Sequence, residues 1–225
     1  KHMEKLGGWE KDNDYVEYRL DVPETAPEKY TKIAEMVEKR YNLHARKLTK
    51  KEIFEGGYGK KLFDLINVTY SHLYGFSELS ERQIDQYVKM YFPLADLDLI
   101  TVVEDGNKDN QLVGLAITIP SLTRALQKCH RGRLFPFGWW HLLRAIKFHK
   151  TEVVDLLLIG VLPEYRSKGA NSLVFADLIP RYVKYGFKWG ETHVEMETNE
   201  SVQSQWGPLD PTMHKKRRCY RKAIG

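Results

Sequence analysis

The sequence predicts an α/β protein with a central sheet flanked by helices, and two observations support this. The unbroken apolar run 156–159 is typical of a buried strand, and the apolar spacing over 173–178 is typical of a helix that follows it. Two β-rich runs, 99–104 and 112–119, are separated by a polar segment with turn-forming residues and predict a hairpin. A buried strand that leads into a helix, beside a hairpin, places both kinds of element in one fold.

Residues 1–26 are predicted to form an N-terminal arm. A pair of glycines ends a short helical segment there, and 15–20 has the composition of a strand. Prolines then mark a linker, and Pro27 suits the first position of a helix. The main domain is predicted to span 27–225.

The first half of this domain is predicted to contain three helices and a strand. Apolar residues recur at helical spacing over 33–41, 62–73 and 84–91. The residues from Ser80 to Gln83 form a capping box before the last of these helices. The segment 43–48 reads as a short strand.

The segment 121–150 is a predicted helical insert between the hairpin and the buried strand. It is far longer than a usual hairpin loop, and apolar residues recur at helical spacing over 122–129 and 141–148. The aromatic residues of 135–140 need a packing partner. Two arrangements are open: the rings pack as an extra core layer, which we expect for most of them, or they roof a cleft.

The turn after the buried strand has the chemistry of an anion site. Pro163 ends strand pairing, Arg166 and Lys168 add positive charge, and Gly169 lets a backbone approach a ligand closely. The helix that begins here presents unpaired N–H groups and partial positive charge, which suit a phosphate or pyrophosphate. An ordinary solvated basic turn explains the same residues equally well. The spacing matches neither a P-loop nor a dinucleotide Gly-x-Gly-x-x-Gly motif.

The run Val161-x-Pro163-x-Tyr165-Arg166-x-Lys168-Gly169-Ala170 resembles the acetyl-coenzyme A loop of the GNAT superfamily, the Gcn5-related N-acetyltransferases. Arg166 and Gly169 match the family pattern Arg/Gln-x-x-Gly-x-Gly/Ala, whereas Asn171 stands where Gly or Ala is usual. The resemblance implies that acetyl-coenzyme A is the cosubstrate and that its pyrophosphate binds the loop residues Arg166, Ser167, Lys168, Gly169, Ala170 and Asn171.

The same resemblance, which spans roughly Leu48 to the end, implies the architecture. The sheet is expected to be central, twisted, and mixed but mostly antiparallel, with the insert 121–150 between its third and fourth strands. The first residues also resemble the end of the last helix of another GNAT domain. Residues 1–26 are therefore either a simple arm or the tail of a preceding GNAT-like domain in a tandem protein.

A second stretch supports the resemblance. Residues 195–199 read as the strand that ends in Asn199, and 201–206 as the short helix that follows it in the family. In many members a Tyr seven residues past this Asn protonates the leaving thiolate, but the residue here is Trp206, whose indole N–H is no acid near neutral pH. Asn199 and Trp206 are placed at the coenzyme A site, and the proton is expected from Tyr74 or from solvent.

The resemblance implies direct attack of an amine on the thioester in a ternary complex. A backbone N–H at a bulge in the central strand polarises the acyl carbonyl. Ile159, Gly160 and Val161 match this position, with Gly160 suited to the bulge. A carboxylate or His must take the proton from the amine. Glu197 is favoured as this base among candidates that the sequence does not separate, the others being Glu104, Asp155, His193 and Glu195.

Composition narrows the class and the partners. The chain has 225 residues, 42% of them hydrophobic, and a net charge of +5, which suits anionic ligands without demanding nucleic acid. Its two distant cysteines, Cys129 and Cys219, imply no disulfide framework, so a reduced cytoplasmic setting is expected. No apolar run approaches the length of a membrane span. Neither a membrane partner nor a metal is predicted.

Three functions remain open at this stage. The favoured one is acetyl transfer from acetyl-coenzyme A to an amine of unknown identity. The second is an acyl-coenzyme A-binding module that has lost catalysis, for which Asn171 and Trp206 are the motives. The third is a basic interaction protein that uses the run 214–224 on nucleic acid. That run is otherwise expected to be a strand with a solvated face, or to help hold the 3′-phosphate end of coenzyme A.

Overall fold

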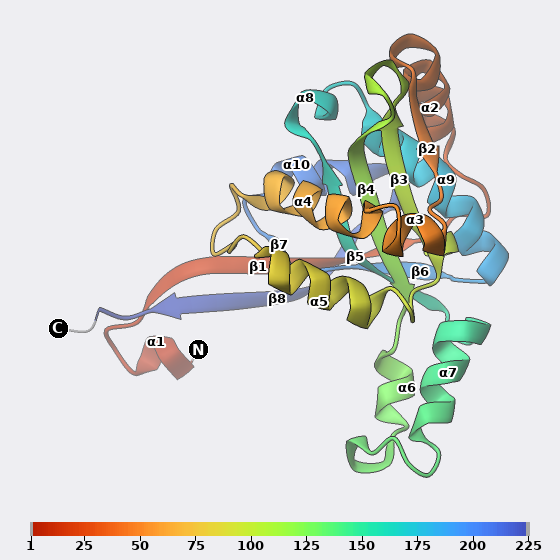
Figure 1. Ribbon diagram of the computed structural model, residues 1–225. Helices are drawn as coiled ribbons and strands as arrows, with labels where there is room; N and C mark the ends of the chain where they lie inside the picture. Colours follow the sequence, from red (N-terminus) through yellow and green to blue (C-terminus); the bar gives the residue numbers. More distant parts are fainter. Residues whose placement is uncertain (1, 224–225) are drawn as a thin grey trace.

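The computed structural model describes residues 2–223, and its centre is one sheet with the strand order β2-β3-β4-β5-β6-β1-β7, to which β8 is added by pairing with β1 (Figure 1). All described strand pairs are antiparallel except β5 with β6. The predicted mixed, mostly antiparallel sheet is confirmed. Lys1 and residues 224–225 of the predicted arm and domain lie outside the described residues. The strands are β1 (Glu10–Asp21), β2 (Leu43–Arg46), β3 (Ile100–Asp105), β4 (Gln111–Pro120), β5 (Val153–Val161), β6 (Trp189–Thr192), β7 (Glu195–Met196) and β8 (Thr212–Arg221).

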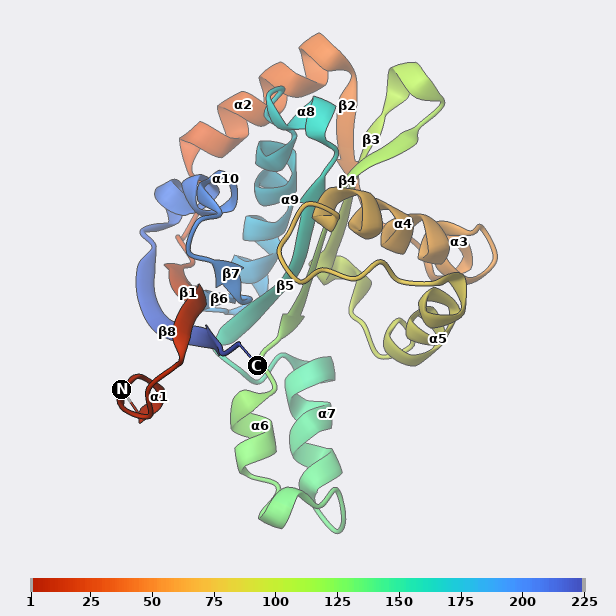
Figure 2. The ribbon, with the colours of Figure 1, turned by 90° about the vertical axis from the view of Figure 1, so that its left-hand side faces the viewer.

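Helices cover both faces of the sheet (Figures 1 and 2). On one face α2 (Glu28–Tyr41) packs on α9 (Ala170–Tyr185), and on the other lie α3 (Lys50–Phe54), α4 (Tyr58–Tyr70) and α5 (Glu81–Tyr91). The short helices are α1 (His2–Lys5), α6 (Thr123–Gln127), α7 (Gly138–Phe148), α8 (Pro163–Arg166) and α10 (Glu200–Gln203), with the 3₁₀ segment η4 (Ser204–Leu209). Across residues 2–223, every helix is too short or too polar to cross a membrane.

Alternation along the strands creates two apolar cores. On β3, Ile100 and Val102 face the core beneath α4 and α5, whereas Val103 faces the core beneath α9 and α2. Both faces of this strand are buried, which is why 99–104 reads as a continuous apolar run. Around β3 the sheet is therefore the middle of three layers, whereas β8 at its other end is almost entirely exposed.

The N-terminal strand β1 is built into the sheet. It pairs with β6, β7 and β8, and Val16 and Leu20 are buried. The segment 1–26, expected as an arm, thus supplies a strand to the same sheet as the domain that it precedes. Whether it is also the tail of a preceding GNAT-like domain stays a prediction.

The basic residues of β8 are paired with acids of neighbouring strands. Asp14 of β1 is buried and accepts from Arg218 at 2.8 Å, and Lys215 lies 3.0 Å from Glu17. The hydrogen bond from Arg218 is the main reason that the pKa of Asp14 lies well below its ordinary value. The basic run 214–221 is therefore a strand with an exposed face, and ion pairs with neighbouring acids help to hold it in the sheet. Further partners of β8 are Glu4, Glu191 and Glu197.

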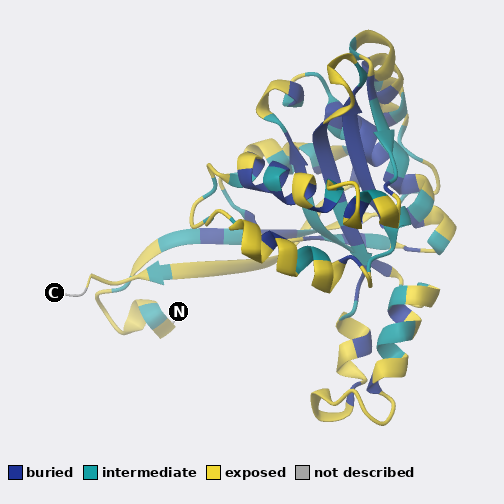
Figure 3. Cartoon of the chain, viewed as in Figure 1, coloured by how far each residue is buried: buried dark blue, intermediate teal, exposed yellow. Residues whose placement is uncertain are grey.

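The insert forms a helical hairpin, α6 and α7, that projects from the end of the sheet between β4 and β5 (Figures 1 and 3). The two helices meet at small residues: Cys129 and Gly138 are buried there, and a Cβ on Gly138 would lie 2.2 Å from the Arg133 carbonyl oxygen. Large rings do not fit this contact. Phe135 and Phe137 are 77% and 72% exposed, so the extra core layer expected of these rings is wrong.

Gly160 sets how closely α4 lies on β5. A Cβ at this position would stand 2.7 Å from Thr69 Oγ1, closer than such atoms approach in proteins. We expect Gly160→Ala to lower the free energy of unfolding by about 1–3 kcal/mol, because the helix must move off the strand. Chemical denaturation measures the change.

Gly207→Ala is the matched control, since no atom lies within 4 Å of a Cβ added there. In a Thr69→Ala background the Gly160→Ala substitution should cost clearly less. An equal cost in both backgrounds would show that this contact is not the cause.

Candidate functional site

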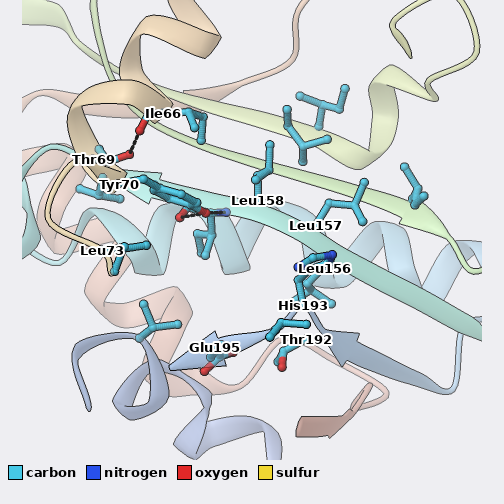
Figure 4. Close-up of a pocket in the computed structure, with 18 of the residues that line it drawn as sticks. Ile66, Thr69, Tyr70, Leu73, Leu156, Leu157, Leu158, Thr192, His193 and Glu195 are labelled. Carbon is cyan, nitrogen blue, oxygen red and sulfur yellow. Dashed lines mark hydrogen bonds between the residues drawn. The ribbon is translucent and has the colours of Figure 1, made fainter. Parts of the chain in front are cut away.

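β5 and β6 separate beyond Leu156, and the opening between them is one part of a large cavity. Their parallel pairing ends where Leu156 faces Thr192. The cavity has a volume of 870 Å³, near the upper end for small-molecule sites, which is about 1,000 Å³. Its walls come from β5, from the segment after β6, and from α4 and α5 (Figure 4).

The bulge in β5 lies at Leu157. The register with β4 shifts between Ile117 and Thr118, which face Leu158 and Leu156, so Leu157 is the extra residue. The bulge expected at Gly160 is therefore misplaced by three residues. Gly160 instead provides room for α4, as described above.

The exposed edge of β5 is occupied by a tyrosine that the sequence analysis did not single out. The Tyr70 hydroxyl donates to the Ile159 carbonyl oxygen at 3.0 Å and accepts from the Ile159 N–H at 3.2 Å. It takes the place that a neighbouring strand would have (Figure 4). Burial raises the pKa of Tyr70 above its ordinary value. In sequence Tyr70 is one apolar-face residue of a helix, and nothing there relates its hydroxyl to a strand 89 residues away.

The predicted phosphate loop connects α8 to α9. Gly169 has φ +85° and caps α9, whose first amides have no partner within the helix. Arg166 is committed to the protein: its guanidinium donates to the carbonyl oxygens of Val161 and Thr69 at 3.0 and 3.3 Å. The Lys168 ammonium lies over the ring of Tyr165, 4.3 Å from its centroid. Within the loop, the N–H groups of Lys168 and Gly169 already donate to the carbonyl oxygens of Tyr165 and Arg166. The amides suited to a ligand are therefore those at the start of α9, Ala170 and Asn171, while the two cations hold local structure.

The cavity brings together most of the predicted site residues. Ser167, Lys168, Gly169, Ala170 and Glu197 do not line it. Those that do are Tyr74, Ile159, Gly160, Val161, Arg166, Asn171, Asn199 and Trp206.

Two carboxylates line the cavity: Asp96, which pairs with His149, and Glu195. The Glu195 side chain is 9% exposed, its Oε1 accepts a hydrogen bond of 3.0 Å from the Trp206 indole N–H, and its Oε2 has no hydrogen-bond partner among the described residues. Burial raises the pKa of Glu195 to about 7, and the polar side chains of Thr192 and Trp206 offset only part of this shift. A carboxyl group that titrates near neutral pH in a cavity is suited to proton transfer.

Glu197, the expected base, lies outside the cavity. Its side chain is 40% exposed and pairs with Lys216 and, at 3.3 Å, with Lys11. The hydrogen bond from Lys216 is the main cause of its lowered pKa. A carboxylate stabilised in this way is a weak base, and it lies away from the cavity in which the base was expected, whereas Glu195 lies within it.

The other proton-transfer candidates have different places. Tyr74 is exposed and donates to Asp12 at 2.6 Å, which raises its pKa. Glu104 is buried beneath α3 and accepts from Arg46 and from the Tyr58 hydroxyl, as a structural carboxylate does. Asp155 does not line the cavity. His193 lines it at the rim, where its side chain is exposed.

The remaining wall of the cavity is strongly apolar. Aliphatic and aromatic side chains of α4, of α5 and of the loop after α5 face it, and Leu122 and Ile146 at the base of the helical hairpin join them. Such a lining can bury a hydrocarbon chain as well as the pantetheine arm. The apolar residues include Phe63, Ile66, Leu73, Phe76, Leu79, Tyr87, Tyr91, Phe92 and Leu94.

The raised pKa of Glu195 predicts a pH-dependent stability. The unfolded chain keeps the ordinary value of 4.5, so between pH 4.5 and 7 it loses a proton that the folded protein retains. Protonated Glu195 therefore adds on the order of 3 kcal/mol to the free energy of unfolding. This contribution is fully present below pH 4.5 and is lost as the pH rises through 7. Urea denaturation from pH 4 to 8 should show this decrease in the wild type and not in Glu195→Gln.

Glu197→Gln provides the control with the opposite sign, because the pKa of Glu197 is lowered. Its wild-type contribution is present above the ordinary pKa and is lost as the pH falls. Identical pH profiles for wild type and Glu195→Gln would contradict the burial of an ionisable Glu195.

Two known proteins are similar to the chain in sequence. No protein-family model matches the chain. The bacterial ceramide synthase of Caulobacter vibrioides is 23% identical over 175 residues, and protein YghO of Escherichia coli is 23% identical over 167 residues. Each match covers 72% of this chain and 42% of the relative, so the chain spans less than half the length of these proteins.

Solved structures show the fold. A GCN5-related N-acetyltransferase from Sphaerobacter thermophilus superposes with a TM-score of 0.61 at 9% identity, covering 98% of this chain and 55% of that one. The GCN5-related glucosamine N-acetyltransferase region of a fungal multi-domain GH3 β-N-acetylglucosaminidase gives 0.59 at 12% identity, covering 97% and 22%. Together with the strand order and the opening between β5 and β6, these likenesses identify the architecture of the chain as the GNAT fold.

Proposed function

We propose that the chain is an N-acyltransferase that moves an acyl group from an acyl-coenzyme A thioester to an amine. The observation that carries the proposal is Glu195, a buried carboxyl group with a pKa of about 7 that faces a large apolar cavity beside the unpaired edge of β5. At neutral pH such a group is partly ionised and can accept a proton without strong charge repulsion.

The chemistry needs one base and one acid. The amine nitrogen attacks the thioester carbonyl carbon, so the C–N bond forms and the C–S bond breaks. Glu195 takes the proton that the nitrogen loses, and the thiolate is protonated to the thiol of coenzyme A. We infer that backbone N–H groups near the β5 bulge stabilise the oxyanion. The Tyr70 hydroxyl, which borders the same strand edge, replaces the acid that is absent at Trp206.

The acyl group or the amine is proposed to carry a long hydrocarbon chain. Acetyl, the donor group suggested by the sequence, is the shortest member of this series and leaves most of the 870 Å³ apolar cavity unfilled. The relative in Caulobacter vibrioides is a ceramide synthase by name, which supports a lipid substrate for the shared region.

Coenzyme A is proposed to place its pyrophosphate at the end of the loop 166–171, on the amides of Ala170 and Asn171 that begin α9. The support is the capped helix start beside the cavity, with Asn171, Asn199 and Trp206 at its edge. Asn171→Asp puts a negative charge at this helix start. We expect it to weaken coenzyme A binding roughly tenfold, measured by calorimetry, because like charges repel there.

Gln127→Glu on α6 adds the same charge at a distance from the loop and should leave the affinity unchanged. If Asn171→Asp binds coenzyme A as tightly as wild type, the phosphate site lies elsewhere.

The reaction is tested by release of free thiol from acyl-coenzyme A donors of two to sixteen carbons, with amines from small hydrophilic ones to long alkylamines. Glu195→Gln should lower kcat/KM by about 10²- to 10⁴-fold, the range for a positioned base. Its affinity for coenzyme A should be unchanged. His193→Asn, at the rim of the same cavity, is the matched control and should retain activity within about tenfold.

The variant Trp206→Phe tests whether Glu195 acts as the base or only supports the structure. Activity should rise with pH through an apparent pKa near 7, and removal of the indole donor should move that pKa upward, because Trp206 stabilises the charged form. An unmoved pH profile would remove Glu195 from the reaction. Tight coenzyme A binding without turnover of any amine would favour the acyl-coenzyme A-binding module instead.

A further inference from the structure

The end of the helical hairpin carries an unusual density of exposed apolar side chains. Leu134, Phe135, Phe137, Trp139 and Trp140, called the aromatic tip from here on, are 50%, 77%, 72%, 46% and 43% exposed. They lie on the connection between α6 and α7 and on the first turn of α7, the part of the hairpin farthest from the sheet (Figure 3). Contiguous apolar surface of this kind on a soluble domain marks an interaction site.

The insert 121–150 accounts for the excess of positive over negative charge in the whole chain. Residues 121–150 contain seven Lys or Arg and no Asp or Glu, whereas the rest of the sequence has 28 basic and 30 acidic residues. The net charge of +5 therefore comes from the insert alone. Among residues 2–223, one of the seven basic side chains forms an ion pair with an acid: Arg124 lies 3.6 Å from Glu152. Both of these side chains are more than half exposed. The basic residues are Arg124, Lys128, Arg131, Arg133, Arg144, Lys147 and Lys150.

The hairpin is held in a fixed direction at its base. His149 follows α7 with φ +47°, lies 2.7 Å from the Asp96 carboxylate and stacks on the ring of Tyr185 with centroids 3.9 Å apart. The aromatic tip is consequently presented away from the body of the domain (Figures 1 and 2). A flexible loop with the same composition would bury its rings against the nearest apolar surface.

We propose that the aromatic tip and its basic residues bind the surface of an anionic lipid bilayer. Rings with polar edges reside at the interface between head groups and hydrocarbon, and flanking Lys and Arg gain from the negative surface potential. This is peripheral binding, and it differs from the sequence-based expectation of no membrane partner.

Two other occupants fit the surface less well. A second copy of the chain would bring two clusters of seven positive charges together, which is unfavourable. Single-stranded nucleic acid binds aromatic residues along a positively charged groove, whereas the residues of the aromatic tip belong to the end of a projecting helical hairpin. Charge complementarity and shape together favour the bilayer.

The site also lies next to the proposed reaction. Leu122 and Ile146, at the base of the hairpin, line the cavity that contains Glu195. If the proposed function holds, a hairpin docked on a bilayer sets the apolar cavity beside the source of a long-chain substrate. The binding itself does not depend on that function, so the two are tested separately.

The experiment is co-sedimentation of the full chain with vesicles of phosphatidylcholine containing 30% phosphatidylglycerol, and with vesicles of phosphatidylcholine alone. We expect binding to the anionic vesicles that weakens with salt, and at least tenfold weaker binding to the neutral ones. Phe135→Ser with Phe137→Ser should weaken the anionic partition by about tenfold or more. Lys128→Glu with Arg133→Glu should do the same.

Controls are drawn from α2, on the body of the domain. Met36→Ser removes an apolar side chain that is 46% exposed, and Lys29→Glu with Lys39→Glu reverses two charges; both variants should bind as wild type does. All variants should keep the wild-type melting temperature, since the tip side chains are exposed. The proposal is overturned if wild type ignores anionic vesicles, or if the tip and control variants bind equally. It is also overturned if light scattering shows a dimer that the tip variants dissociate.

Discussion

The separation of β5 from β6 after Leu156 is the constraint on which the rest of the site depends. Once β6 leaves, the free edge of β5 has N–H and C=O groups that must find partners, since unpaired buried backbone is costly. Tyr70 supplies one hydroxyl that satisfies both groups of Ile159. A side chain can be displaced where a paired strand cannot, so the opening is available to an extended ligand without unfolding the sheet.

The departure from the family pattern at Trp206 is connected with the hydrogen bond that Trp206 donates to Glu195. In the GNAT pattern that the sequence resembles, the position of Trp206 carries a Tyr with its own proton to give. Here the indole gives only a hydrogen bond, and it gives it to a carboxyl group that burial keeps near neutrality. The departure in sequence thus coincides with a buried carboxyl group that the indole holds in place.

The sequence predicts much of the framework and less of the site. The strand, basic turn and helix of 155–178 are local patterns, and they appear where expected. The place of β1 is not local, because its partners lie at the other end of the chain. Glu195 and Glu197 look alike in sequence, two residues apart on an apparent strand. β7 ends at Met196, however, so the chain turns before Glu197 and sends its carboxylate to Lys11 and Lys216.

The position of β1 also has a consequence for the order in which the protein matures. Its register pairs join Arg19 to Glu191 and Glu10 to Arg221, contacts of very long sequence separation. During synthesis β1 leaves the ribosome before β6 and β8 and must wait, with one face apolar, until those strands have appeared. Closing such distant pairs is slow, and an unpaired strand is open to wrong partners meanwhile. β1 is made before the strands that it pairs with and is expected to find its place late, so the stretch 10–21 is where we expect chaperones to engage a nascent chain.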